Sequence, residues 1–377
     1  MNSAELAQAL LQAVRAQRFE LTADSMLGGA AIGAHPSIDL AVAAFPTDLS
    51  SAGAPVFANV LFSREHPQGL VAEIAANAGA VRNIAFVADQ QDADGNSIAW
   101  LPGSDWRQMS WLPLTGSGDT RFVAPYPASL IKLMVLVGVA RLVDAGRSAW
   151  SQPLRFGSQT RPVGDWAFDM MTISCNTSTS ALVAHLHAVG AITAGHNELH
   201  QLFESLDLSS LRLAKTAANG GWGNAAGAGV GQLQMTAWDS LRLLWLLDDV
   251  APPAPWLPVD RPPLLAASHA HVMHCLREQR LHEILSSSAI TDIPGWVPGI
   301  PTGSDGDVLF AHKTGNTDNY SADAGIVRGI GPAKRYYLIA LTSNLGRRYA
   351  PAGCRAPWSL PALGAAVDGV MREMLGD

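Results

Sequence analysis

Charge, cysteine and long hydrophobic runs are all scarce in this 377-residue sequence, and each scarcity argues against a class of protein. Charged residues make up 15% of the chain, the net charge is −7 and no run of Lys and Arg stands out, so nucleic acid is not an expected partner. No apolar stretch is long enough to span a bilayer, since the candidate at 130–143 is short and contains Lys132 and Arg141. We therefore expect a globular protein with no membrane partner.

The cysteines are too few and odd in number for a disulfide framework. The chain has three, Cys175, Cys275 and Cys354, which favours a reducing compartment and buried thiols. The first residues lack the basic start and unbroken apolar core of a secretory signal, because Glu5 interrupts them early. Both observations predict a cytoplasmic protein.

Residues 1–57 are interpreted as an N-terminal extension that precedes a single domain over 58–377. Leu6, Leu10 and Val14 recur at helical spacing, so the extension begins with an amphipathic helix. An Ala-, Pro- and Gly-rich stretch follows at 44–54. Whether this extension covers a cleft, packs on the domain or pairs with another copy of the chain stays open.

The rest of the chain reads as strands at both ends and helices between them. Periodicity predicts helices over 69–80, 130–145, 166–189, 195–206, 236–249, 268–285 and 360–375. Apolar runs predict strands over 83–89, 97–101, 307–312, 322–328 and 336–342, the first two joined by a turn at 92–96. This order predicts an α+β fold: a central antiparallel sheet flanked by helices, with an all-helical subdomain over about 132–300 inserted in it.

Three short polar strings stand out in this pattern. They are Ser129-Leu-Ile-Lys132, Ser174-Cys-Asn176 and Lys313-Thr-Gly315, in the order S-x-x-K, S-x-N, K-T-G. A single S-x-x-K occurs by chance on the order of once per few hundred residues, so each string alone is a weak signal. Three in this order, each in a suitable local setting, form a strong one.

The first string has the composition of an activated nucleophile. Ser129 and Lys132 lie three residues apart near the start of a predicted helix, so their side chains share a face. A serine hydroxyl needs a base, and a lysine serves as one when burial or a second cation lowers its pKa. The apolar neighbours of Lys132 suit such burial. Taken alone, the string also fits a helix-capping serine followed by a surface lysine.

The other two strings supply polar groups at a helix break and on a strand. Ser174 and Asn176 separate two helical runs, where a bend would point both side chains into a cleft, although helix capping explains them equally well in isolation. Lys313 follows the apolar run 308–311 and therefore lies on a strand. Taken alone, this string also fits an ordinary edge-strand lysine followed by a turn.

The three strings resemble those of the penicillin-recognising serine hydrolases, and class A β-lactamases in particular. The resemblance covers roughly residues 65–377 and implies an active site between the mixed and the all-helical subdomains. It implies Ser129, Lys132 and Ser174 as catalytic residues, with Ser174 relaying a proton to the leaving group. It also implies substrate binding by a further set of residues: Asn176, Lys313, Thr314, Gly315 and Asn316, with the Ser129 and Asn316 backbone N–H groups as the oxyanion hole.

Two features depart from class A β-lactamases. No Asp or Glu lies between Asp207 and Asp239, where those enzymes carry the glutamate that activates water against the acyl-enzyme. Asp323 lies ten residues after Lys313, where they often carry a carboxylate-binding arginine. Whether Arg328 or His312 compensates stays open.

We therefore expect a serine hydrolase that acts on an amide, ester or β-lactam carbonyl of a small-molecule or peptide-like substrate through a Ser129 acyl-enzyme. A D,D-peptidase-like enzyme or a biosynthetic transacylase is the alternative, and a catalytically weak binding module or an interaction protein working through 1–57 is a further one. No cofactor is expected. His269, His271 and His274 lie close in sequence but lack further ligands at metal-binding spacing, so no metal is expected either.

Overall fold

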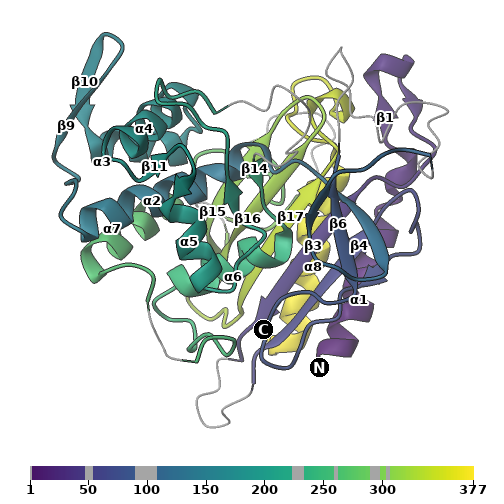
Figure 1. The fold of residues 1–377 in the computed structure, drawn as a ribbon. Coiled ribbons are helices and arrows are strands. Elements are labelled where there is room, and N and C mark those ends of the chain that lie inside the picture. The colour runs from purple at the N-terminus through teal and green to yellow at the C-terminus, as the bar shows by residue number, and fades with distance from the viewer. Residues whose placement is uncertain are drawn as a thin grey trace.

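A computed structural model of the chain describes residues 2–46, 54–89, 108–222, 233–258, 262–288, 298–302 and 306–377. Its centre is a six-stranded sheet in the order β15-β16-β17-β3-β4-β5, in which every neighbouring pair is antiparallel (Figure 1). The strands are β3 Ile38–Ala44, β4 Val56–Phe62, β5 Leu70–Val71, β15 Val308–Asn316, β16 Ser321–Gly329 and β17 Tyr336–Ser343. The sheet thus joins the two ends of the sequence.

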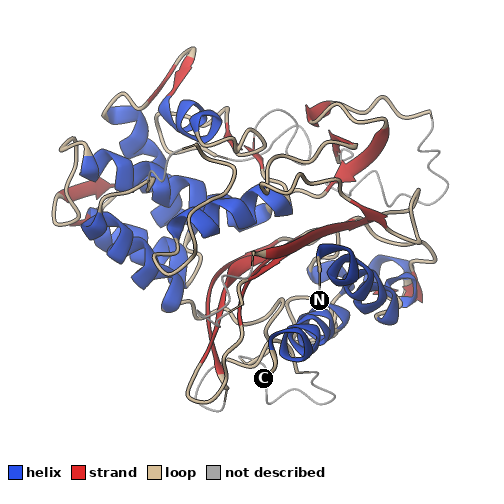
Figure 2. Ribbon diagram, turned by 90° about the horizontal axis from the view of Figure 1, so that it is seen from below, coloured by secondary structure: helices blue, strands red, loops and turns tan. Residues whose placement is uncertain are grey.

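Helices cover both faces of this sheet (Figure 2). Helices α1 (Ser3–Ala16) and α8 (Ser359–Leu375) pack together on one face, with α1 against β4. The other face carries the helical group, with α6 against β3 and β17. This group comprises α2 Lys132–Asp144, α3 Val163–Thr172, α4 Asn176–Ala188, α5 Glu198–Ser205, α6 Ala237–Leu247 and α7 Ala266–Arg277.

Strand β3 shows how the sheet separates two large hydrophobic cores. Leu40 and Val42 belong to the core under α1 and α8, whereas Ala41 and Ala43 belong to the core of the helical group. Because successive side chains of a strand point to opposite faces, a strand buried on both sides must be apolar almost throughout. The one acidic residue of β3, Asp39, accepts hydrogen bonds from Asn59 Nδ2 (2.7 Å) and the Ala237 backbone N–H (2.9 Å).

Short strands complete the architecture. A three-stranded sheet in the order β7-β6-β8, formed by β7 Pro113–Thr115, β6 Ile84–Ala88 and β8 Thr120–Ala124, leads the chain into the helical group. The remaining strands form two-stranded pairs: β1 Ala23–Asp24 with β2 Ala30–Ala31, β9 Pro153–Phe156 with β10 Gln159–Pro162, β11 Ile192–Thr193 with β12 His196–Asn197, and β13 Arg212–Leu213 with β14 Leu233–Gln234.

The α+β class and the central antiparallel sheet predicted from the sequence are confirmed. The helix predicted over 69–80 is wrong: Gly69 has φ +83° and Ala78 φ +54°, which no α-helix accommodates, and the segment holds only β5. The predicted turn at 92–96 and strand at 97–101 lie outside the described residues.

The described parts of residues 1–57 are built into the domain. The sequence analysis set them apart as an extension, whereas the structure places β3 between β17 and β4 in the middle of the sheet. The apolar face of α1, which includes Leu6, Leu10 and Val14, is buried in the core it shares with α8. These residues therefore contribute to the main core of the same chain.

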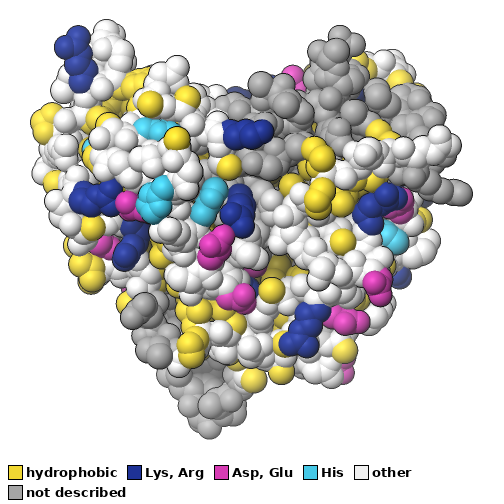
Figure 3. Space-filling view, in the orientation of Figure 1, with side chains coloured by type: hydrophobic (Ala, Val, Ile, Leu, Met, Phe, Trp, Pro, Cys, Tyr) yellow, Lys and Arg dark blue, Asp and Glu magenta, His cyan; other side chains and the backbone are white. Residues whose placement is uncertain are grey.

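Charges of both signs are interspersed on the face seen in Figure 3. Ion pairs account for part of this mixture, such as Arg147 with Glu198 at 2.7 Å. Among the helices that the structure describes, none combines the length and apolar character needed to cross a membrane.

Candidate active site

Ser129 and Lys132 meet at the start of the helical group. After β8, the chain enters a single 3₁₀ turn, Ala128–Ile131, and α2 begins directly at Lys132. Residues i and i+3 eclipse each other in 3₁₀ geometry, so the two side chains superimpose along the turn. The Lys132 Nζ consequently lies 2.9 Å from the Ser129 Oγ. Ser129 is half-buried, while Lys132 is fully buried.

The edge strand β15 lies directly against this turn because of Gly315. A Cβ atom at Gly315 would approach the Pro127 carbonyl oxygen to 2.5 Å and the backbone nitrogen of Ser129 to 2.9 Å. These are backbone atoms that cannot move aside independently, so only glycine permits the approach. The contact places the Ser129 turn directly against Gly315, the residue that precedes Asn316.

Ser174 enters from the turn between α3 and α4. Its backbone has φ +56°, a left-handed conformation that is unusual for a residue with a side chain. Residues held in such conformations cluster at functional sites. The turn points the Ser174 Oγ to within 2.9 Å of Lys132 Nζ and 3.1 Å of Lys313 Nζ. Asn176, the first residue of α4, places its Oδ1 2.8 Å from Lys132 Nζ.

The amine of Lys132 is therefore surrounded by oxygen atoms. Besides Ser129 Oγ, Ser174 Oγ and Asn176 Oδ1, its Nζ donates to the Ser174 carbonyl oxygen at 2.7 Å. Two of these four oxygens, the carbonyl of Ser174 and the amide oxygen of Asn176, can only accept hydrogen bonds. The two hydroxyls can accept or donate.

Both lysines have lowered pKa values. Burial lowers the pKa of Lys132 to about 7, against a weaker opposite effect of Cys175. Burial also holds the pKa of Lys313 well below its usual range; the nearby Lys132 lowers it further and Asp323 opposes. Since both amines contact the same Ser174 Oγ, two ammonium groups there would repel each other. Burial and this repulsion both favour the neutral form of at least one of the two amines.

The remaining predicted substrate-binding residues follow along β15. Thr314 is 4% exposed and lies directly opposite Asp323 in the β15–β16 ladder. Asn316 donates from Nδ2 to the Arg355 carbonyl at 2.6 Å, while its Oδ1 is buried without a hydrogen-bond partner among the described residues. The eight residues singled out from the sequence thus belong to two neighbouring segments of the helical group and one edge strand.

Asp323 occupies a structural position. Its Oδ1 lies 2.7 Å from His312 Nδ1, and its Oδ2 accepts the Leu285 backbone N–H at 3.1 Å. His312 Nε2 in turn lies 2.9 Å from His282 Nδ1. Burial, reinforced by His312, lowers the pKa of His282 to about 3. No short-range sequence pattern predicts this Asp–His–His chain, because its members come from a loop and two strands.

Neither residue considered as a replacement for the missing arginine reaches the site. Arg328 pairs with Leu309 near the far end of β15 and its guanidinium contacts Asp248. His312 is fully buried and lies, as alternation along the strand predicts, on the face opposite Lys313. Arg355 is an exposed arginine whose backbone carbonyl accepts the hydrogen bond from Asn316. Its guanidinium Nε lies 3.4 Å from Glu283 Oε2.

The other features noted in the sequence have packing roles. His271 stacks on Trp150, His274 stacks on Phe168, and His269 hydrogen-bonds the Leu247 carbonyl. Across the described ranges, no group of three or more His, Cys, Asp or Glu side chains is placed to hold a metal ion. All three cysteines are free, and burial raises the pKa of Cys275 to about 12.

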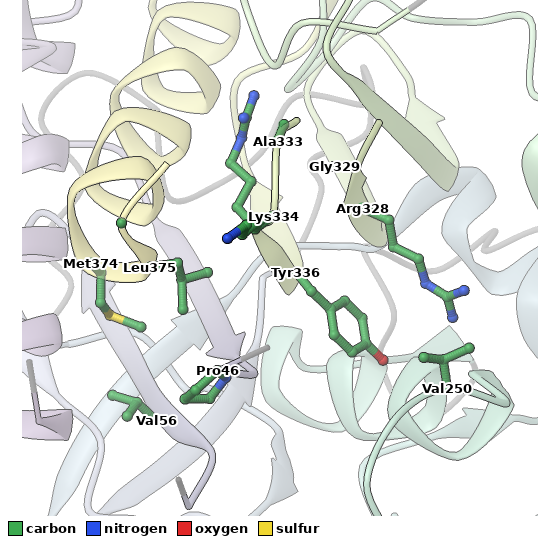
Figure 4. Close-up of a pocket in the computed structure, with 12 residues that line it drawn as sticks. Pro46, Val56, Val250, Arg328, Gly329, Ala333, Lys334, Tyr336, Met374 and Leu375 are labelled. Atoms are coloured by element: carbon green, nitrogen blue, oxygen red, sulfur yellow. The ribbon is translucent and has the colours of Figure 1, made fainter. Parts of the chain in front are cut away.

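A cavity of about 760 Å³ lies at the opposite end of the sheet from Asn316 (Figure 4). Arg328, Lys334, Tyr336 and the C-terminal end of α8 line it. Two of the lining side chains are already paired: the Tyr336 hydroxyl donates to Asp248 at 2.7 Å, and Arg335 binds three carboxylates. No nucleophile and base meet there among these lining residues.

A sheet with a helical group on one face, and a serine, two lysines and a second serine between them, defines the class of penicillin-recognising serine hydrolases. A sequence model described as the beta-lactamase enzyme family matches residues 118–353. The chain therefore belongs to the β-lactamase enzyme family, and is a serine hydrolase of that family. No curated protein matches its sequence.

Several solved structures are similar to this chain at low sequence identity. A β-lactamase from Desulfarculus baarsii DSM 2075 is 12% identical with a TM-score of 0.51, covering 100% of this chain and 99% of its own. A PBP-A variant in an acyl-enzyme complex with penicillin G is 16% identical with a TM-score of 0.49, covering 100% and 97%. A β-lactamase from Sphaerobacter thermophilus DSM 20745 is 16% identical with a TM-score of 0.46, covering 67% and 83%.

Proposed function

We propose that the protein cleaves an amide, ester or β-lactam carbonyl through an acyl-enzyme on Ser129, with Lys132 as the general base. The single observation that carries this proposal is the short contact between a buried lysine amine and the serine hydroxyl, 2.9 Å from Nζ to Oγ. A nucleophile within hydrogen-bond reach of a base whose pKa is shifted toward neutrality is the arrangement that acyl transfer needs.

Hydrogen-bond accounting supports the neutral form of Lys132. A neutral amine has two N–H donors and one lone pair. The Ser174 carbonyl at 2.7 Å and the Asn176 Oδ1 at 2.8 Å accept only, so they use the two N–H groups. The lone pair is then left for a hydroxyl proton, and Ser129 Oγ provides one. A pKa of about 7 makes this form abundant near neutral pH.

Acylation follows from these positions. The Ser129 proton moves to Lys132 Nζ while Oγ bonds to the substrate carbonyl carbon, and the backbone N–H groups of Ser129 and Asn316 stabilise the oxyanion. The carbon–leaving-group bond then breaks. Ser174, whose Oγ bridges Lys132 and Lys313, returns a proton to the leaving group. Asn176 holds a polar group of the substrate, a small molecule or peptide-like acyl compound.

Removal of the acyl group is where this chain differs from class A β-lactamases. No Asp or Glu lies between Asp207 and Asp239, so that segment offers no carboxylate base for water. Asp323 is occupied by His312 and the Leu285 N–H. These observations favour slow hydrolysis, and with it an acylating enzyme of the D,D-peptidase or transacylase kind over an efficient β-lactamase.

Labelling tests the nucleophile. The full-length protein and Ser129→Ala are incubated with a fluorophosphonate and with a penicillin, and adducts are located by mass spectrometry. We expect an adduct on Ser129 in the native protein and none at that position in the variant. The labelling rate should rise with pH through about 7 and then level off, because the neutral form of Lys132 is the base. The absence of both adducts would mean a binding module.

A chromogenic cephalosporin separates the enzyme classes. A stoichiometric burst followed by slow turnover is expected for a site that acylates and does not clear with water. Rapid multiple turnover would instead identify an efficient β-lactamase and overturn the assignment of a slow-clearing site. The same assay with substrates of either charge tests whether Asp323 beside Thr314 disfavours an anionic substrate group.

A further inference from the structure

Gln279 is a buried residue, 3% exposed, in the loop that follows α7. Its Nε2 donates to the Met171 carbonyl oxygen at 3.1 Å and to the His312 carbonyl oxygen at 3.4 Å. Its Oε1 accepts the backbone N–H groups of Arg280 and Leu281, both at 3.0 Å. Because the two carbonyls only accept and the two N–H groups only donate, a single orientation of the amide satisfies all four contacts. The side chain is therefore fixed between its own loop, α3 and β15.

Both carbonyl groups lie where regular secondary structure leaves acceptors without a partner. Met171 is in the last turn of α3, and the last four carbonyls of an α-helix have no partner within the helix. The neighbouring Thr172 carbonyl accepts the Arg280 N–H at 3.0 Å. His312 belongs to β15, the edge strand of the sheet, and an edge strand presents backbone groups that no neighbouring strand pairs. Gln279 therefore supplies hydrogen-bond donors at a helix end and at a sheet edge.

The two segments that Gln279 joins carry Ser174 and Lys313. Ser174 comes shortly after Met171, beyond the end of α3, and Lys313 directly follows His312 on β15. The two side chains meet at 3.1 Å, from Ser174 Oγ to Lys313 Nζ. Since the two residues are 139 positions apart along the chain, this contact depends on how the end of α3 and β15 are held together. Gln279 bridges the backbones of both segments close to these residues.

We propose that Gln279 is a positioning residue, which holds the turn of Ser174 against Lys313 so that Ser174 passes a proton to the leaving group. This inference rests on the proposed function, in which Lys132 takes the Ser129 proton. Ser174 Oγ lies 2.9 Å from the Lys132 Nζ that then carries it. With an ester, the Ser174 hydroxyl gives its proton to the leaving-group oxygen as the bond from that oxygen to the acyl carbon breaks, and Lys132 returns a proton to Ser174. Protons and bonds balance, and no co-reactant is needed.

Loss of the Gln279 amide should affect the two proton transfers unequally. Without its N–H donors, the two carbonyls would lack their partner, which favours separation of the segments or entry of water between them. Ser129 and Lys132 lie together in one turn, and the four hydrogen bonds of Gln279 are to other segments, so removal of the Ser129 proton should persist. Proton donation by Ser174 should weaken. A weakly basic leaving group needs little proton donation, whereas a strongly basic one depends on it.

Two esters with the same acyl group test this difference. Native protein and Gln279→Met are treated with p-nitrophenyl acetate or with phenyl acetate, whose phenolate is the more basic leaving group, and mass spectrometry follows acetylation of Ser129. For Gln279→Met we expect acetylation by phenyl acetate to slow by about 10- to 100-fold, as displacement of a catalytic group by about 1 Å does, and acetylation by p-nitrophenyl acetate to change by less than about threefold. Equal slowing with both esters, or no slowing with either, would overturn the inference.

A double-mutant cycle shows whether Gln279 acts through Ser174. Ser174→Ala should also slow acetylation by phenyl acetate more than acetylation by p-nitrophenyl acetate. Adding Gln279→Met to Ser174→Ala should then slow the phenyl acetate reaction no further, because the group that Gln279 positions is already absent. Additive losses in the double variant would contradict the positioning role.

Two further variants keep the test independent of folding. Asn59→Leu is the matched control, because Asn59 is also a buried amide whose Nδ2 donates to two oxygens, Asp39 Oδ1 at 2.7 Å and the Leu40 carbonyl at 3.0 Å. It should lower the melting temperature and keep the native ratio of the two acetylation rates; a ratio like that of Gln279→Met would contradict the inference. Gln279→Asn keeps an amide with a shorter reach, so it should show the same selective loss if Gln279→Met does not fold. If neither ester acetylates Ser129 in the native protein, the proposed function fails and the inference fails with it, an outcome distinct from equal slowing.

Discussion

The two faces of strand β15 make different kinds of contact. On one face, Lys313 and Gly315 meet the Ser129 turn and Ser174, where polar atoms contact one another at 2.7–3.1 Å and both lysines have lowered pKa values. On the other face, His312 stacks on Phe310 and hydrogen-bonds Asp323 in full burial. One face has the properties of a reactive site, and the other those of a scaffold.

The difference also shows the structural role of Asp323. It lies on the scaffold face of the sheet and uses both carboxylate oxygens there. Gly325 leaves room for His312 beside it, because a Cβ at that position would lie 2.3 Å from the Cβ of His312. These buried contacts stabilise β15 from the face opposite Lys313. Substitutions on the two faces should accordingly separate loss of activity from loss of stability.

The largest effect is expected from Lys132→Met, on the reactive face. Methionine fills similar space but cannot accept the Ser129 proton, so the rate of fluorophosphonate labelling should fall about 10²–10⁴-fold. Circular dichroism and the melting temperature check that the fold persists. A labelling rate within a factor of about three of the native rate, a difference well below that expected from general-base catalysis, would remove Lys132 from the mechanism.

Gly315→Ala tests the contact between β15 and the Ser129 turn. The added methyl group would lie 2.5 Å from the Pro127 carbonyl oxygen, so strand and turn must separate and the oxyanion N–H groups move apart. We expect acylation to slow by about 10²–10³-fold, the effect of losing one oxyanion donor. Gly369→Ala in α8 is the control, since its Cβ meets nothing within 4 Å. Equal burst rates for the two variants would contradict the close approach.

Asp323→Ala probes the scaffold face. It leaves His312 Nδ1 and the Leu285 N–H without their partner inside the protein. Removing one member of a buried pair costs about 3–5 kcal/mol, so the free energy of unfolding in urea should fall by about that amount. In conditions where the variant is folded, Ser129 should still be labelled. If the variant unfolds at the same urea concentration as the native protein, the Asp–His–His chain contributes nothing to stability.

Sequence reasoning could group the residues of the Lys313 face because several of their contacts are local. Ser129 and Lys132 are three residues apart, and the 3₁₀ turn that aligns them needs no distant partner. Ser174 and Asn176 likewise share one turn. That these segments converge followed from the family resemblance, since no short-range rule relates Lys313 to Ser174, 139 positions away along the chain.

The scaffold face was harder to predict because its contacts are long-range. His312 was placed on the correct face by alternation, but its partners Asp323 and His282 depend on strand register and a loop path. Strand β3 was missed for a similar reason. A strand buried on both faces shows no alternation between apolar and polar residues, and pairing with β17 joins positions about 300 residues apart.

Asp39 on β3 is a second buried carboxylate that can be compared with Asp323. Of the substitutions considered, the one at Asp39 is expected to have the smallest effect. Asn59 and the Ala237 N–H bind it without a cationic partner, and burial raises its pKa to about 6. A carboxyl whose folded pKa exceeds its unfolded pKa of 3.8 stabilises the fold at low pH, and that contribution is lost as pH rises from about 4 through about 6. The Asp39→Asn variant does not titrate at this position. In urea unfolding, its free energy of unfolding relative to that of the native protein should therefore increase by about 2–3 kcal/mol as the pH rises from about 4 to about 6. Parallel stability curves would mean that Asp39 titrates alike in the folded and unfolded states.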